Sequence, residues 1–179
     1  MVTQLPVELD GERVKLRCWR VDDAATLSAL VQANLDHLRP WMPWVASEPL
    51  TEEERRDLIV GWARARVAGG DAIYGIYVDG EAIGGCGLHH RIGPYGLEIG
   101  YWVAQPHCRR GYASDAASAM TAAALSTEGI RCVEIHHDKE NVASAGVPRR
   151  LGYRFIGERP SEMPAPGGAA ISWVWRIER

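Results

Sequence analysis

The fold is decided by one stretch of sequence, Glu98-Ile-Gly-Tyr-Trp-Val-Ala-Gln-Pro-His-Cys-Arg-Arg-Gly-Tyr-Ala-Ser-Asp-Ala-Ala-Ser-Ala-Met120. Around its start, Leu97, Ile99, Tyr101 and Val103 alternate with Glu98, Gly100 and Trp102, which predicts a β-strand. Pro106 ends this strand, because proline has no N–H to donate to a neighbouring strand. Beyond Gly111 the apolar residues follow helical spacing. They are Ala113, Ala116, Ala117, Met120 and Ala124.

A strand that ends in a glycine-bearing turn and opens a helix predicts an anion site. The first amides of a helix have no intrahelical acceptor, and the helix dipole adds positive charge there. Arg109 and Arg110 beside the turn strengthen the prediction of a phosphate site. No GxxxxGK[ST] or GxGxxG motif is present, which disfavours P-loop and Rossmann sites. On these residues alone, a plain strand–turn–helix connection remains the alternative.

The bulk composition limits the classes of protein to consider. The 179 residues, 46% hydrophobic and 24% charged, predict one globular domain over residues 1–179. The net charge of −3 disfavours nucleic acid as a partner. The four scattered cysteines form no CxxC pair, which disfavours a disulfide framework or a zinc site. With no membrane-length apolar run and no signal-peptide pattern at the N-terminus, we expect a cytoplasmic protein.

The remaining elements predict an α/β fold with one central, twisted mixed sheet of about seven strands and about four helices. We expect strands at residues 13–19, 72–78, 81–88, 97–104, 131–136, 153–157 and 170–177, and helices at residues 22–38, 51–69, from 111 onward and within 141–151. The helix between the fourth and fifth strands makes them parallel, and we expect them to splay apart where the fourth strand ends. That opening would form a cleft.

The segment Leu38-Arg-Pro-Trp-Met-Pro-Trp44 is interrupted by two prolines, which argues against regular structure. It places Trp41 and Trp44 on a loop. These tryptophans either plug the junction between helices or wall a substrate pocket, and the two interpretations are compatible.

A second motif, Asn141-Val-Ala-Ser-Ala-Gly-Val-Pro-Arg-Arg-Leu-Gly-Tyr-Arg-Phe-Ile-Gly157, follows the fifth strand. Together with Arg-Arg-Gly-Tyr-Ala, Glu-Ile-Gly-Tyr-Trp-Val and the Pro-Trp loop, it resembles the GNAT superfamily of acetyl-CoA-dependent N-acetyltransferases, in its RimJ/RimL-like branch of ribosomal-protein N-acetyltransferases. The resemblance spans nearly the whole chain. One departure is Cys108, in the first slot of the Gln/Arg-x-x-Gly-x-Gly/Ala signature. Since this site works mainly through backbone amides, we expect the change to be tolerated.

The resemblance implies an enzyme with acetyl-CoA as co-substrate and no metal. The acceptor would be a primary amine, foremost a protein or peptide N-terminal α-amine, which attacks directly in a ternary complex, so that Cys108 is structural and not a nucleophile. Alternatives are a small-molecule (antibiotic or polyamine) N-acetyltransferase, another acyl-CoA transferase, and, from a different class, a non-catalytic acyl-CoA-binding module.

The resemblance also implies residue roles. The strand end would pair with the pantetheine arm, the loop amides would hold the pyrophosphate, and Asn141 would fix the cofactor arm. The expected cofactor-binding residues are Trp102, Val103, Cys108, Arg109, Arg110, Gly111, Tyr112, Ala113, Ser114 and Asn141. Ser144 would protonate the departing thiolate, unless it is only a helix N-cap.

On the acceptor side, Glu98 is the candidate base that takes a proton from the amine, directly or through water. A solvated strand residue is the alternative role for Glu98, and a histidine or water could replace it as base. Trp41, Trp44 and His89 are expected to bind the acceptor.

The two histidine pairs, His89-His90 and His136-His137, lie on predicted strands. Neighbouring residues on a strand face opposite sides of the sheet, so neither pair can chelate a metal as a unit. Finally, an exposed last strand with its tryptophans would allow a homodimer.

Overall fold

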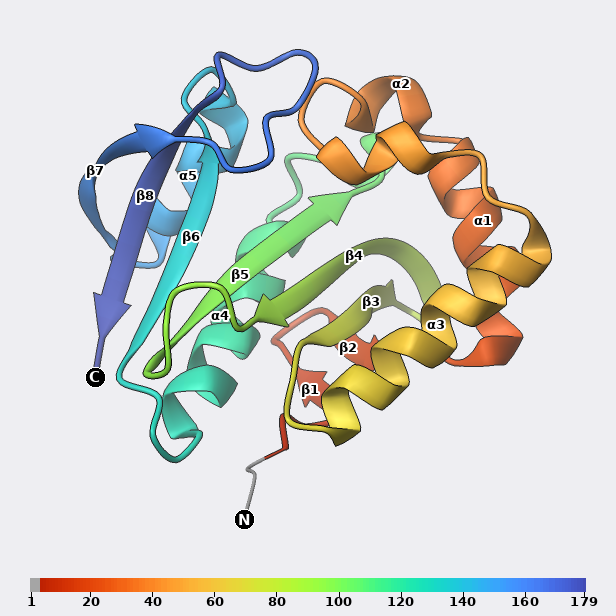
Figure 1. Ribbon diagram of the computed structural model, residues 1–179, viewed down its shortest axis with the longest axis horizontal. Helices are drawn as coiled ribbons and strands as arrows, with labels where there is room; N and C mark the ends of the chain where they lie inside the picture. Colours follow the sequence, from red (N-terminus) through yellow and green to blue (C-terminus); the bar gives the residue numbers. More distant parts are fainter. Residues whose placement is uncertain (1–3) are drawn as a thin grey trace.

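The computed structural model describes residues 4–179, which form one mixed sheet with helices against both faces (Figure 1). The expectation that the N-terminus carries no signal-peptide pattern falls in part on residues 1–3, which lie outside the described residues. The strands are β1 (Glu8–Asp10), β2 (Lys15–Cys18), β3 (Ala72–Val78), β4 (Glu81–His89), β5 (Gly96–Val103), β6 (Cys132–Asp138), β7 (Arg154–Pro160) and β8 (Ile171–Glu178).

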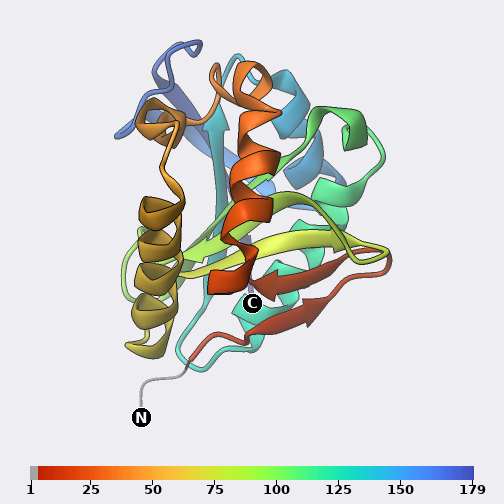
Figure 2. The same cartoon turned by 90° about the vertical axis from the view of Figure 1, so that its right-hand side faces the viewer.

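The helices include short 3-10 turns, labelled η. They are η1 (Val21–Asp23), α1 (Ala24–Gln32), α2 (Leu35–Leu38), η2 (Pro43–Ser47), α3 (Glu52–Val67), η3 (Gln105–His107), α4 (Tyr112–Ser126) and α5 (Val142–Arg150). Figure 2 shows α3 and α4 on opposite sides of the sheet. No helix within residues 4–179 is long and apolar enough to cross a membrane.

The predicted mixed sheet is confirmed, with strand order β1-β2-β3-β4-β5-β6-β8-β7. Only the β5–β6 pair is parallel among the pairs of the described chain. The hairpin turn between β3 and β4 has positive φ at Asp79 (50°) and Gly80 (84°), as a type I′ turn requires. One strand more than expected is present, since β1 pairs with β2 across a short turn. Three residues are too few for alternation to reveal a strand.

The position of the last strand corrects the sequence-based expectation. β8 lies between β6 and β7, and β7 is the edge strand at that end of the sheet. Trp175 of β8 is only 6% exposed. The premise for a homodimer through an exposed last strand is therefore wrong, because periodicity cannot tell which strand of the β7–β8 hairpin lies inside.

Two further local expectations are corrected. The helix expected at residues 22–38 is divided into η1, α1 and α2, with the buried Asn34 between the last two. The Asn34 side chain donates to Leu30 O (2.8 Å) and accepts from the Gln105 amide (2.8 Å). The Pro-Trp loop is partly regular, since Pro43 begins η2. Proline is tolerated at a first helical position because its missing N–H would have no acceptor there.

The strand β5 and the helix α4 form the centre of the larger core. Leu97 and Ile99 of β5 are fully buried, as are Ala116, Ala117 and Met120 of α4, and all five belong to one cluster. This confirms the apolar faces predicted for both elements. The alternate residues of β5, from Glu98 to Trp102, consequently face the side of the sheet that α1 and α3 cover. On that side Trp102 packs against a second cluster of buried apolar residues.

The expected splay between the fourth and fifth predicted strands is confirmed at β5 and β6. Their pairing begins at Gly96↔Cys132 and ends at Ile99↔Ile135. Beyond that point β5 stays paired with β4 as far as Val103, whereas β6 continues along β8 to Asp138. The two strands therefore diverge, as Figure 1 shows.

Candidate active site

The turn between β5 and α4 has the geometry of an anion site. Gly111 is the N-cap of α4 with a left-handed φ of 84°, and Arg109 also has a positive φ of 59°. No side chain caps the first turn of α4, so its amides are available to an anionic ligand. The predicted cofactor loop, residues 108–114, is therefore a backbone cradle with Arg109 and Arg110 exposed beside it.

Sequence analysis missed Arg13, which reaches this cradle from the turn between β1 and β2. Its Nη2 donates to Arg110 O (2.8 Å), and its guanidinium carbon lies 5.2 Å from the centre of the Tyr112 ring. A Cβ at Gly111 would lie 2.6 Å from the same Nη2. Glycine is thus favoured at this position by both its φ and the arginine. Arg13 is 97 positions from Arg110, and no local pattern links the two residues.

Asp115, in the first turn of α4, holds Arg13 in place. Its carboxylate accepts from the backbone amides of Glu12 (2.8 Å), Arg13 (2.7 Å) and Val14 (3.0 Å). Ser114 is buried beside it, and Arg150 of α5 donates to the Ser114 hydroxyl (2.9 Å). The cradle is therefore held by contacts with the β1–β2 turn near the N-terminus and with α5 in the C-terminal part of the chain.

Cys108 is half-buried and faces the protein. Its sulfur lies 3.5 Å from His37 Nε2, 3.5 Å from Val103 O and 3.6 Å from Ala104 O. Burial raises the pKa of the Cys108 thiol, although the nearby Arg109 opposes this. Such a thiol is poorly ionised, which suits a structural cysteine better than a nucleophile.

The end of β5 packs closely on glycines of β4. Gly84 pairs with Val103 and Gly85 with Trp102, and a Cβ at Gly85 would lie 2.7 Å from the Trp102 indole nitrogen. The indole of Trp102 lies across this glycine, with its centroid 6.0 Å from that of Trp44.

The two interpretations of the Pro-Trp loop are distinguished in part by burial. Trp44 is 39% exposed, whereas Val45 beside it is 1% exposed. Val45 therefore plugs the helix junction, and Trp44 stands beside Trp102 over the face that bears Glu98. Trp41 is half-buried.

Across the opening, α5 brings Asn141 and Ser144 toward β5. Asn141 is the N-cap, and its Oδ1 accepts from the Ser144 amide (3.2 Å). The alternative in which Ser144 is merely a helix cap is thus wrong. The Ser144 hydroxyl lies 2.9 Å from the hydroxyl of Tyr101, a residue that the sequence analysis did not single out.

Glu98 belongs to a charged cluster on the face of the sheet opposite α4. Its carboxylate lies 3.3 Å from His136 Nδ1 and 3.7 Å from Arg91 Nη1. The other ring nitrogen of His136 is 2.5 Å from Glu134, which is fully buried and also accepts from Arg159 (3.1 Å) and Arg176. Glu98 is therefore held in a network and is not a freely solvated strand residue.

Glu134 is the buried centre of this cluster. Burial alone would raise the pKa of its carboxyl, but hydrogen bonds from His136 and Arg176 outweigh that effect and hold it below the usual range. His136 with both ring nitrogens protonated would donate to both carboxylates. The strand pattern marks Glu134 and His136 only as members of one face, so their pairing could not be predicted.

His89 lies on the same face, next to Glu98 in the β4–β5 register. Its Nδ1 is 2.7 Å from the carboxylate of Asp71, which also accepts from the His90 amide (2.8 Å). Burial would raise the pKa of Asp71, but the bond with His89 and the His90 amide lower it overall. A Cβ at Gly100 would lie 3.4 Å from His89 Nε2, so this nitrogen lies over β5 on the face that bears Glu98.

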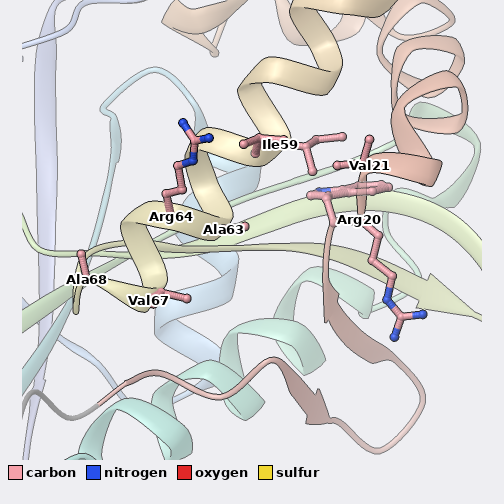
Figure 3. Close-up of a pocket in the computed structure, with 9 residues that line it drawn as sticks. Arg20, Val21, Ile59, Ala63, Arg64, Val67 and Ala68 are labelled. Carbon is pink, nitrogen blue, oxygen red and sulfur yellow. The ribbon is translucent and has the colours of Figure 1, made fainter.

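No group of three or more His, Cys, Asp or Glu side chains within residues 4–179 is arranged to hold a metal ion. A separate groove of about 610 Å³ lies between α3 and the start of η1, lined by apolar side chains such as Ile59 and Val67 with Arg20 and Arg64 at its edges (Figure 3). None of the candidate site residues lines it.

A strand that leaves its parallel neighbour and runs into a backbone anion cradle is the arrangement expected of an acyl-CoA-dependent transferase. Residues 13–154 match the model of the acetyltransferase (GNAT) domain, and the chain therefore belongs to the GNAT family of acetyl-CoA-dependent N-acetyltransferases. A comparison with curated proteins gave no significant match.

Solved structures of similar fold include RimJ from Mycobacterium smegmatis in complex with CoA-disulfide (23% identity, 99% of this chain and 90% of that chain, TM-score 0.85). Another is the Salmonella typhimurium acetyltransferase that modifies the N-terminal serine of ribosomal protein L7/L12 (21%, 98% and 98%, 0.80). A third is the microcin C7 self-immunity acetyltransferase MccE in complex with acetyl-CoA and AMP (15%, 100% and 100%, 0.87). At these identities the likeness establishes the fold.

Proposed function

We propose that this chain, acting as a single domain, transfers the acetyl group of acetyl-CoA to the N-terminal α-amine of a protein or peptide. The observation that carries this proposal is the opening between β5 and β6, which has the anion cradle at one end, Ser144 on one side and the face of Glu98 on the other. The Salmonella typhimurium acetyltransferase of similar fold modifies the N-terminal serine of a ribosomal protein, which supports a protein or peptide acceptor.

In this proposal the cofactor arm lies along Trp102 and Val103, where one backbone N–H polarises the thioester carbonyl. The pyrophosphate takes the amides of residues 108–114, with Arg109, Arg110 and the newly identified Arg13 adding positive charge. Asn141 caps α5 and fixes the pantetheine side of the cleft.

On the acceptor face, Glu98 takes the proton that an α-amine must lose before it attacks, since the reference pKa of such an amine is near 8. Glu98 precedes Trp102 by four positions, about 13 Å along an extended strand, so the proton reaches it through water. We expect Trp41, Trp44 and His89 to contact the acceptor. Asp71 orients His89, which makes this histidine the main rival as base.

The test is a thiol-release assay with purified protein, acetyl-CoA and a panel of N-terminal peptides, polyamines and aminoglycosides. We expect turnover with unblocked peptides and none with Nα-blocked ones. Mass spectrometry during turnover should find no acetyl group on Cys108. Turnover with small amines alone would favour the second candidate, a small-molecule N-acetyltransferase. Binding of acetyl-CoA without turnover on any acceptor would indicate a non-catalytic module.

A further inference from the structure

The hydroxyl of Ser144 has a second hydroxyl as its partner. Tyr101 belongs to β5 just beyond Ile99, the last residue of β5 paired with β6, so its side chain crosses toward the first turn of α5. Its oxygen lies 2.9 Å from Ser144 Oγ and 3.2 Å from Ser144 O. The Ser144 backbone is fixed independently by the Asn141 cap, so its hydroxyl can turn while the residue stays in place.

The hydrogens of this pair can be arranged in two ways. Each hydroxyl carries one proton, and the backbone carbonyl of Ser144 can only accept. If Tyr101 donates to that carbonyl, its oxygen accepts from Ser144, and the serine proton points away from the cleft. If Tyr101 donates to Ser144 Oγ, the serine proton is free to point at a sulfur in the cleft. A developing thiolate is an acceptor, and it selects the second arrangement.

Tyr101 is suited to donate a hydrogen bond and not to give up its proton. Burial raises the pKa of its hydroxyl well above the usual value, which the bond with Ser144 only partly offsets. A tyrosinate at this place would be costly, because the charge would lie in a poorly solvated site. The proton of the phenol therefore remains available to the serine oxygen throughout.

We propose that Tyr101 is a positioning residue that turns the Ser144 hydroxyl toward the departing sulfur. This role rests on the proposed acetyl transfer. When the amine nitrogen bonds to the carbonyl carbon, the C–S bond breaks and its electron pair leaves with sulfur. Before this attack, Glu98 has accepted one proton from the ammonium form of the amine. Ser144 then gives its own proton to the sulfur and takes the remaining surplus proton from the nitrogen. Amide, free thiol and one proton on Glu98 result, so the step balances.

The test compares Tyr101→Phe with wild type for two donors, acetyl-CoA and the acetyl thioester of 4-nitrothiophenol, whose thiolate is a better leaving group. With acetyl-CoA we expect kcat to fall about tenfold at unchanged KM, as the loss of one oriented hydrogen bond implies. With the activated thioester the two proteins should react at nearly equal rates, because the leaving group no longer needs help. Ser144→Ala, which alters a half-exposed side chain, should show the same donor dependence.

Tyr153→Phe is the matched control. Tyr153 is also buried, and its hydroxyl lies 2.6 Å from that of Thr121 on α4 and makes no hydrogen bond with Ser144. This variant should keep the wild-type kcat with both donors.

In the Ser144→Ala background, Tyr101→Phe should cause no further loss, since it acts through the serine. A wild-type kcat in Tyr101→Phe, an equal loss with both donors, or an additive loss in the double variant would each overturn this role while leaving acetyl transfer intact. Absence of thiol release from the wild-type protein would overturn the proposed function, and this role with it.

Discussion

Three side chains on the acceptor face compete for the role of base, and their partners distinguish them. Glu98 faces His136 and Arg91, His136 lies between two carboxylates, and His89 is tied to Asp71 through one nitrogen only. Glu98 keeps carboxylate oxygens that can accept a proton, whereas both nitrogens of His136 are engaged. Glu98 and His89 are thus the two candidate bases that an experiment must distinguish.

We predict that Glu98→Gln lowers kcat by about 10²- to 10⁴-fold and removes the acidic limb of the pH–rate profile. The rate of an enzyme with a carboxylate base falls as the pH falls, because protonation removes the acceptor, and glutamine cannot titrate. Stopped assays of kcat against pH check this.

His89→Gln is the companion variant. It should keep the acidic limb and chiefly raise the KM for the acceptor, since His89 lines the acceptor face. The reverse result, with the limb lost in His89→Gln and kept in Glu98→Gln, would transfer the role of base to the Asp71–His89 pair.

At the scale of elements, the β5–α4 turn is the part of the site in which local sequence and tertiary packing agree. Its helical stripe, its glycine and its proline all indicate the same strand–turn–helix unit, and the structure adds Arg13 from the β1–β2 turn. Because Asp115 clamps that turn through three amides, the N-terminal hairpin and the cofactor loop form one unit.

Gly111→Val should raise the KM for acetyl-CoA about tenfold or more with a smaller change in kcat. A β-branched residue is strained at a φ of 84°, and its Cβ would displace Arg13 from the cradle. Initial rates at varied acetyl-CoA, or direct titration with CoA, measure the effect.

Gly129→Val controls for backbone strain alone. Gly129 has a nearly identical φ of 85°, but a Cβ there meets nothing within 4 Å. This variant should lose about 1–3 kcal/mol of stability and keep the wild-type KM. If Gly111→Val also binds CoA normally, the cofactor loop has been misplaced.

For the whole molecule, the two helices on one side of the sheet are joined to the Pro-Trp loop by a buried ion pair. Arg55 of α3 is 2% exposed and contacts both carboxylate oxygens of Glu48 (2.6 and 2.8 Å), just after η2. Its Nε donates to Ser28 of α1 (3.1 Å). One guanidinium thus ties α1, α3 and the loop that carries Trp44.

Arg55→Met should lower the free energy of unfolding by about 3–5 kcal/mol, because it leaves the Glu48 carboxylate buried without its partner. Urea unfolding followed by circular dichroism measures this loss. Arg56→Met is the control on the same helix: its pair with Glu52 is exposed, and we expect a loss below about 0.5 kcal/mol. Equal effects of the two changes would contradict the structural role given to Arg55.

Patterns between near neighbours in the chain determined much of this protein from the sequence alone. The alternation in β5 and the apolar stripe of the helix after Gly111 each depend on residues within one element, and the structure confirms both. The spaced motifs around Gly111 and Asn141 likewise sufficed to indicate the family that the comparison shows.

Tertiary structure alone decided what depends on residues distant in the chain. The inner place of β8, the reach of Arg13 to Gly111, the burial of Glu134 among cations and the bond from Tyr101 to Ser144 all arise where separate elements meet. Periodicity reports which face of an element is buried, but it carries no information on which element lies opposite. The chemistry of the side chains in the cleft depends on those opposite partners. The cofactor loop could therefore be recognised from the sequence, whereas the distant residues that hold it in place could not.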